Sequence, residues 1–164
     1  MLVQQEPGVA GTSVLGVRVS AVNLDQATNE ILRWLDQGEQ HYVSVTGVHG
    51  LIEAQDHPEF KWILNGSGLV VPDGMPLVWL SRLAGYHHVD RVYGPDLTLH
   101  LSRALAERGS RVFYYGGAAG VAERFAQVLE ARFPGLCTVG VHCPPFRALT
   151  PEEDSQIIEQ INRS

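Results

Sequence analysis

The stretch "RVFYYGGAAGVAERFAQVLEARFPGLCTVGV", residues 111–141, contains the pattern that decides the fold. Residues 111–115 form a short, largely apolar run that predicts a strand, and the glycine-rich residues 116–120 predict a turn. Residues 121–133 predict an amphipathic helix, because their apolar side chains repeat at helical spacing. Residues 136–141 predict the next strand. This order predicts two parallel strands joined by a crossover helix.

The same alternation extends along the rest of the chain. Further strands are predicted at 15–22, 41–45 and 68–71. Helices are predicted at 23–38, from after Thr46 to about Leu64 with a break at Pro58, at 75–85, at 96–109 and after a capping box at 150–153. Short apolar strands alternating with amphipathic helices predict an α/β fold with a mainly parallel sheet and helices on both faces.

Length and composition predict one globular domain. The chain has 164 residues, of which 45% are hydrophobic and 18% charged, with no low-complexity tract. We expect a flexible tail over residues 1–13 and a single α/β domain over 14–164. The net charge of -6 argues against a nucleic-acid partner, because binding to phosphates requires a basic face.

The N-terminal residues predict a cytoplasmic protein, because no basic leader precedes an apolar stretch. Nothing in the chain approaches the roughly 18 unbroken apolar residues that span a bilayer, and peripheral contact with a membrane stays open. Cys137 and Cys143 are expected to be free thiols, with a disulfide or a metal pair as the alternative.

Chemistry is expected at the carboxyl ends of the strands, where open α/β sheets bind ligands. Three features fall there: Thr46, Asp73 in the stretch "VVPDGMPLVW", and the turn at Gly116 and Gly117. A carboxylate among apolar neighbours tends to have a raised pKa and can accept a proton from a hydroxyl. Asp73 is therefore a candidate base, against the simpler alternative of a turn residue or helix cap.

Three other candidate binding features each have a structural explanation as the alternative. Arg91 could pair with phosphate, or form a surface ion pair with Asp90 or Asp96. His49 could line a pocket beyond Thr46, or be a structural histidine. The glycine turn could approach a phosphate, but it lacks the G-x-G-x-x-G spacing of dinucleotide sites and could be purely structural.

The sequence lacks the motifs that are typical of several enzyme classes. There is no D-x-D, H-E-x-x-H, G-x-x-x-x-G-K-[ST] or G-x-S-x-G. These absences argue against metal-dependent sugar-nucleotide chemistry of the D-x-D kind, zinc proteolysis, P-loop hydrolysis and nucleophile-elbow hydrolysis. We expect no metal and no cofactor.

Four stretches in order resemble the WecG/TagA/CpsF glycosyltransferases, which build bacterial surface polymers such as teichoic acid linkage units and exopolysaccharides. They are "VSVTGVHGLIEAQDHPEF", "GLVVPDGMPLVW", "DRVYGPDL" and "RVFYYGGAAGVAERFAQVLEARFPGLCTVG". The resemblance implies a Rossmann-like fold and an inverting, metal-independent transfer from a UDP-sugar, often UDP-N-acetylmannosamine, to a polyprenyl-diphosphate-linked sugar.

By position, the resemblance implies that Asp73 of the P-D-G motif is the general base. It also implies that Thr46, Arg91, Gly116 and Gly117 bind substrate. The resemblance places such an enzyme at the inner face of the bacterial plasma membrane, as a peripheral protein.

Two departures from the family pattern bear on these expectations. Members often read T-P-N where this chain has Thr46-Gly47-Val48, which leaves the transferred sugar open. Members also usually continue beyond a helix like the last one, so we expect the C-terminal part of the fold to be missing. Faces that the missing part would cover predict self-association. The alternatives are a non-catalytic domain that binds a nucleotide sugar or a partner, and a dinucleotide-dependent oxidoreductase, which the glycine spacing disfavours.

Overall fold

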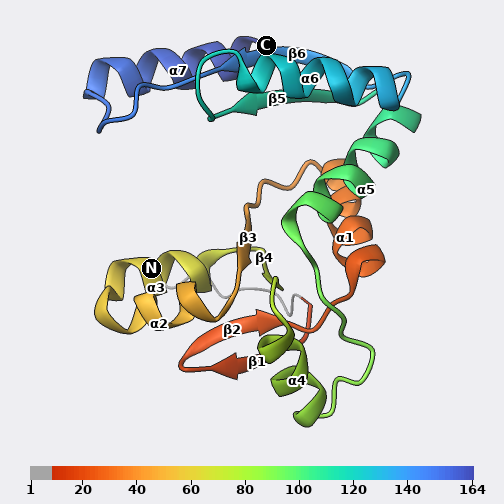
Figure 1. The fold of residues 1–164 in the computed structure, drawn as a ribbon, viewed down its shortest axis with the longest axis vertical. Helices are drawn as coiled ribbons and strands as arrows, with labels where there is room; N and C mark the ends of the chain where they lie inside the picture. Colours follow the sequence, from red (N-terminus) through yellow and green to blue (C-terminus); the bar gives the residue numbers. More distant parts are fainter. Residues whose placement is uncertain (1–8) are drawn as a thin grey trace. The chain divides into compact units, whose positions relative to one another are not determined.

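The computed structural model of the protein describes residues 9–164, which form two compact units divided between His100 and Leu101 (Figure 1). Helix α5 (Gly94–Glu107) contributes residues to both units. Most of the flexible tail predicted at 1–13 lies outside the described residues. The single domain expected over 14–164 stays a prediction.

The first unit begins with an antiparallel hairpin of β1 (Gly11–Val14) and β2 (Val17–Ser20). The sequence analysis was wrong here: it predicted a tail up to residue 13 and one strand over 15–22. Leu15 and Gly16 both have positive φ, 53° and 78°, which is the geometry of a two-residue hairpin turn. Leucine rarely adopts positive φ, so nothing in the sequence signals this turn.

Helix α1 (Leu24–Gln37) confirms the predicted helix at 23–38. The Asn23 side chain accepts a hydrogen bond from the Gln26 backbone N–H, and the Gln26 side chain accepts one from the Asn23 N–H. Gly38 ends the helix in the left-handed conformation, with φ of 68°.

Strands β3 (Val43–Thr46) and β4 (Leu69–Pro72) are parallel, as the pattern predicts. The crossover between them consists of α2 (Val48–Asp56) and α3 (Pro58–Gly66), with the expected break before Pro58. On the other side of β4, the Ser20 hydroxyl of β2 accepts the backbone N–H of Val70 at 3.0 Å.

Alternate residues of β4 enter two separate cores, so helices cover both faces of this strand. Val70 belongs to a core shared with α2, α3, α4 (Met75–Leu83) and β2, whereas Leu69 and Val71 belong to one shared with α1 and α5. Residues pointing to opposite sides of a strand explain this division. The predicted helices on both faces are confirmed here.

The second unit contains the crossover predicted from residues 111–141. Its parallel strands are β5 (Arg111–Tyr115) and β6 (Cys137–His142), joined through α6 (Val121–Arg132). Helix α7 (Pro151–Arg163) follows and starts with the predicted capping box of Thr150 and Glu153. The α/β class is therefore confirmed, with parallel pairing in two of the three strand pairs.

Cys137 and Cys143 are free thiols, as expected. Among the helices of residues 9–164, none combines the length and apolar character needed to cross a membrane.

Candidate active site

Two strand ends meet at one edge of the first unit. Thr46, the last residue of β3, is paired in register with Pro72, the last residue of β4. The backbone N–H of Asp73 donates to the Thr46 carbonyl at 3.0 Å, which fixes Asp73 directly beyond the sheet. Thr46 itself is buried. The predicted convergence of Thr46 and Asp73 at one sheet edge is present in the fold.

Arg91 reaches the same edge from the segment between α4 and α5. The Val92 N–H donates to the Pro72 carbonyl at 2.9 Å, and Val92 is fully buried, so the segment is held beside β4. The Arg91 Nη2 atom lies 3.2 Å from Asp73 Oδ1. The guanidinium also lies over the ring of Tyr93, at 4.4 Å from its centroid.

The ion pair of Arg91 is with Asp73 and not with Asp90 or Asp96, the two surface partners raised as alternatives. Asp90 accepts only the backbone N–H of Arg91, at 2.8 Å, and its carboxylate lies 3.6 Å from the guanidinium of Arg82. The Arg91 guanidinium instead faces the candidate base. Both side chains keep access to solvent, 24% exposed for Asp73 and 46% for Arg91, so a ligand can reach them.

Two helix N-termini flank the ion pair. Gly47 precedes α2 and Gly74 precedes α4, and neither helix has a side-chain cap within the described residues. A Cβ built on Gly74 would lie 3.9 Å from the Gly47 Cα, so the two helix starts are adjacent. Uncapped N–H groups and helix dipoles favour an anion at this point.

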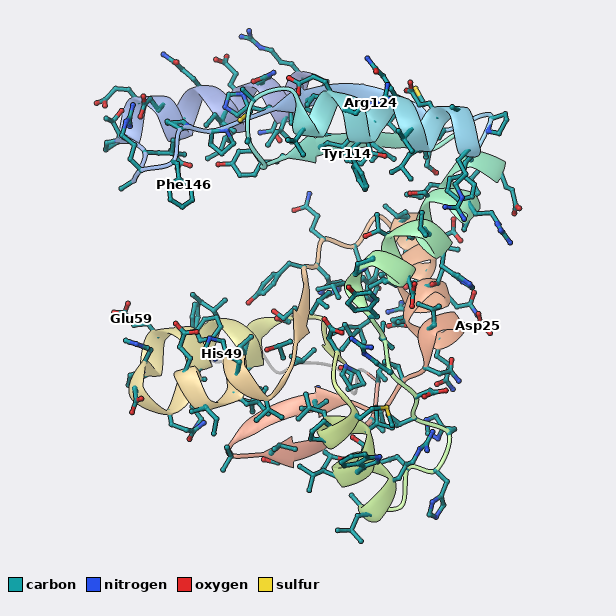
Figure 2. The ribbon with its side chains drawn as sticks, in the orientation of Figure 1. Asp25, His49, Glu59, Tyr114, Arg124 and Phe146 are labelled. Atoms are coloured by element: carbon teal, nitrogen blue, oxygen red, sulfur yellow. The ribbon has the colours of Figure 1, made fainter. Side chains whose placement is uncertain are left out.

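Among the described residues, the side-chain contact of His49 is with Glu53 and not with Thr46, Asp73 or Arg91. Its side chain is 96% exposed on the first turn of α2, and its ring lies 3.8 Å from the carboxylate of Glu53 one turn later. Figure 2 shows His49 on the pair of helices α2 and α3. Its role in binding substrate stays a prediction.

Gly116 and Gly117 lie in the second unit, at the carboxyl end of β5. Both have positive φ, 118° and 81°, which explains why glycine occupies them. The Gly116 N–H donates to the His142 carbonyl at 2.9 Å. Helix α6 starts soon after this turn, from Gly120, with no side-chain cap in the described chain.

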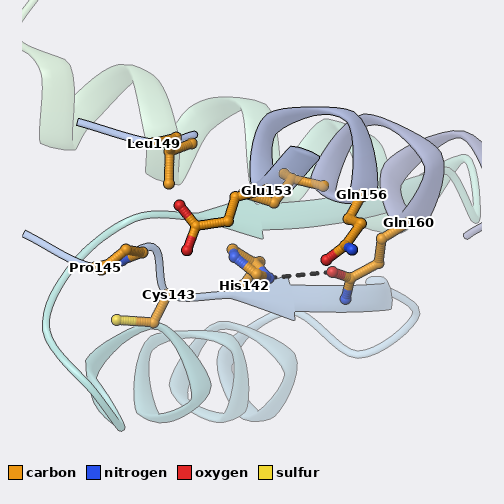
Figure 3. A pocket seen from close by; sticks show the side chains of 8 residues that line it. His142, Cys143, Pro145, Leu149, Glu153, Gln156 and Gln160 are labelled. Carbon is orange, nitrogen blue, oxygen red and sulfur yellow. Dashed lines mark hydrogen bonds between the residues drawn. The ribbon is translucent and has the colours of Figure 1, made fainter. Parts of the chain in front are cut away.

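A pocket of about 260 Å³ lies beside this turn, between the end of β6 and α7 (Figure 3). The His142 ring stacks on Tyr115 of β5, with centroids 5.9 Å apart and ring planes 7° apart. His142 Nδ1 lies 3.1 Å from the Gln160 side-chain oxygen. The sequence analysis missed these residues, although Tyr115 and His142 occupy the last positions of two parallel strands.

Glu153 of this pocket is negatively charged at neutral pH and is paired with Arg147. Hydrogen bonds from Arg147, at 2.6 and 2.7 Å, and from the Thr150 N–H lower the pKa of Glu153 to about 2. In residues 9–164 no three His, Cys, Asp or Glu side chains group closely enough to hold a metal ion.

Comparison with known proteins places the whole described fold in one family. The model for the glycosyl transferase WecG/TagA/CpsF family matches residues 12–164. Two curated relatives carry the name N-acetylglucosaminyldiphosphoundecaprenol N-acetyl-beta-D-mannosaminyltransferase. The one from Bacillus spizizenii is 28% identical over 107 residues, covering 65% of this chain and 42% of the relative. The one from Bacillus subtilis strain 168 is 22% identical over 128 residues, covering 72% and 49%. The chain thus aligns with less than half the length of each relative.

Proposed function

The chain belongs to the WecG/TagA/CpsF family of glycosyl transferases, and from this premise we propose that it takes part in cell-surface polymer synthesis. The proposed reaction moves an N-acetylhexosamine from a UDP-sugar to a polyprenyl-diphosphate-linked sugar. N-acetylmannosamine is the sugar that we favour, because the names of both curated relatives specify it.

The observation that carries this proposal is the Asp73–Arg91 pair beside two uncapped helix starts. In a single displacement, the acceptor oxygen bonds to the anomeric carbon as the bond from that carbon to UDP breaks. Asp73 takes the proton of the acceptor hydroxyl. Positioned proton transfer of this kind contributes about 10²–10⁴-fold to the rate.

Arg91 has two roles in this proposal. Its guanidinium at 3.2 Å orients the Asp73 carboxylate. It also supplies positive charge at the edge where α2 and α4 start. Together with the N–H groups of those helices, it would stabilise the negative charge of a diphosphate.

We assign further substrate contacts to Thr46 and His49 in the first unit and to Gly116 and Gly117 in the second. The glycine turn is supported by its place at a strand end and by the uncapped start of α6. His49 has the weakest support, because its ring faces solvent and Glu53.

The lipid-linked acceptor also leads us to propose peripheral contact with the inner face of the plasma membrane. Apolar faces left uncovered on this chain lead us to propose that it self-associates. Exposed apolar side chains on α4 support both, among them Trp79 and Leu83. A single monomer peak at high concentration in light scattering would contradict self-association.

The test is the release of UDP from a panel of UDP-sugars in the presence of a short polyprenyl-diphosphate acceptor analogue. Wild type and Asp73→Asn are compared under the same conditions. Acceptor-dependent release that collapses in the variant supports the transferase and the base together. UDP binding without release by either protein would favour the alternative of a non-catalytic nucleotide-sugar domain.

A further inference from the structure

We propose that an apolar groove in the first unit binds the isoprenoid chain of the lipid-linked acceptor, an inference that rests on the proposed transferase function. The groove is lined by residues of the β1–β2 hairpin and of the helices α2 and α4, and has a volume of about 520 Å³. Figure 1 shows where these elements lie in the first unit. That volume falls within the roughly 300–1,000 Å³ typical of small-molecule sites. Nine residues line it: Thr12, Ser13, Val14, Leu15, Val48, Leu51, Pro76, Leu77 and Leu80.

The walls of the groove select a hydrocarbon occupant. Seven of the nine lining residues are apolar, none is charged, and the only polar side chains are the hydroxyls of Thr12 and Ser13. A nucleotide sugar or a peptide would lose its hydrogen bonds to water there and find few replacements, at considerable cost. An isoprenoid chain carries no hydrogen-bonding group, so it gains from burial without that cost.

Several groove residues directly follow residues of the candidate active site in the sequence. Val48 directly follows Gly47 at the start of α2, and Pro76 and Leu77 lie in the first turn of α4, just after Asp73 and Gly74. The two helices therefore present N–H groups at one end and apolar side chains along the groove. A lipid diphosphate has the same order of parts: an anionic head followed by an apolar chain.

Several apolar side chains of the groove are exposed to solvent, which supports the proposal that a ligand binds there. Leu15 is 51% exposed, Val48 42% and Leu80 41%. Apolar surface of this kind gathered in one groove marks a binding site more often than an ordinary surface. The acceptor named for both relatives contains undecaprenol, which supplies a long apolar chain attached to a diphosphate.

The experiment compares two acceptors that differ only in the lipid. Both carry N-acetylglucosamine on a diphosphate; one ends in a farnesyl chain and the other in a methyl group. Wild type should show a lower KM for the farnesyl acceptor. Leu80→Gln should raise that KM about tenfold, the loss typical of one missing apolar contact, and leave the KM of the methyl acceptor unchanged.

Leu35→Gln is the matched control, because Leu35 is also a half-exposed helical leucine, 53% exposed, and lies outside the groove. It should leave both KM values unchanged. Equal KM values of wild type for the two acceptors, or equal effects of the two substitutions, would overturn the groove proposal.

A second measurement does not depend on catalysis. A farnesyl diphosphate bearing a benzophenone group should crosslink to peptides containing Leu15 or Leu80 in wild type, and less in Leu80→Gln. Crosslinks to other parts of the chain would overturn the proposal. If Leu80→Gln abolishes dimers in light scattering but leaves the crosslinking unchanged, the proposal is also overturned, and a second copy of the chain is the occupant of the groove. Crosslinking in the groove with no UDP release from either acceptor would instead leave the groove supported and remove the proposed transferase activity.

Discussion

The carboxylate of Asp73 lies 3.2 Å from the guanidinium of Arg91, which joins the residue beyond β4 to one in the segment between α4 and α5. The pair is partly exposed, and ion pairs of this kind contribute little to stability, about 0–1 kcal/mol. Stability therefore gives a weak reason for this contact. We therefore propose that this contact serves chemistry at the site, which the following variants test.

Asp73→Asn is expected to lower kcat by about 10²–10⁴-fold, because the amide cannot accept the acceptor proton. The thermal midpoint should change little, since the backbone N–H that bonds Thr46 is retained. The measurement is UDP release under saturating donor and acceptor, together with a thermal melt.

Asp90→Asn is the control for Asp73→Asn. The Asp90 carboxylate accepts a hydrogen bond from the backbone N–H of Arg91, and an asparagine side-chain oxygen can still accept that bond. Activity should be retained. A loss equal to that of Asp73→Asn would mean that negative charge near Arg91, and not a base at Asp73, supports the reaction.

Arg91→Lys is expected to retain more activity than Arg91→Met, because lysine keeps the positive charge. It should still be less active than wild type, because lysine lacks the planar fork of the guanidinium. The double variant Asp73→Asn/Arg91→Met should lose less than the product of the two single losses, since the partners act as one unit. Steady-state kinetics of wild type, the three single variants and the double variant test this. Losses that multiply without coupling would show that the two residues act independently.

Much of the fold could be predicted from local chemistry. The caps at Asn23 and Thr150 combine residue types that satisfy helix N–H groups within one turn, so they are visible in sequence. Four strand ends were predicted within one residue of their observed positions, at Thr46, Pro72, Tyr115 and His142, whereas the strand predicted over 15–22 was wrong. These features depend on neighbours along the chain.

Features that depend on tertiary contacts could not be predicted. The Asp73–Arg91 pair exists because Val92 bonds Pro72 and brings a distant segment to the strand end. The hairpin turn places Leu15 at positive φ, against its local preference. His49 was predicted to line a pocket or to be a structural histidine, whereas its ring is 96% exposed and lies beside Glu53, one turn later in α2.

Gly50→Ala is expected to lower activity without lowering stability. A Cβ at Gly50 would lie 2.3 Å from the Thr46 hydroxyl oxygen, so that hydroxyl must rotate away from its position. Alanine otherwise favours a helix over glycine by about 1 kcal/mol, and Gly50 lies in the first turn of α2. Thr46→Val, which removes the hydroxyl and keeps the shape, should reproduce the loss of activity. Full activity in both variants would remove the Thr46 hydroxyl from substrate binding.

The capping box of α7 is expected to make the stability of the chain depend on pH through Glu153. Hydrogen bonds from Arg147 and the Thr150 N–H lower the pKa of Glu153 to about 2, from an ordinary value of 4.5. Because the folded pKa is the lower one, this stabilisation is complete above the unfolded value and is lost as the pH falls from about 4.5 toward 2. Thermal melts followed by circular dichroism should give Glu153→Gln a lower midpoint than wild type at pH 7.

The difference between wild type and Glu153→Gln should shrink as the pH is lowered through this window, because protonated Glu153 and glutamine are then both neutral. Glu152→Gln is the matched control: it removes a carboxylate from the same first turn of α7 but leaves the Arg147 contact and the capping box intact. It should lower the midpoint less at pH 7. A difference for Glu153→Gln that stays constant down to pH 2 would show that the glutamate acts by its shape in the capping box and not by its charge.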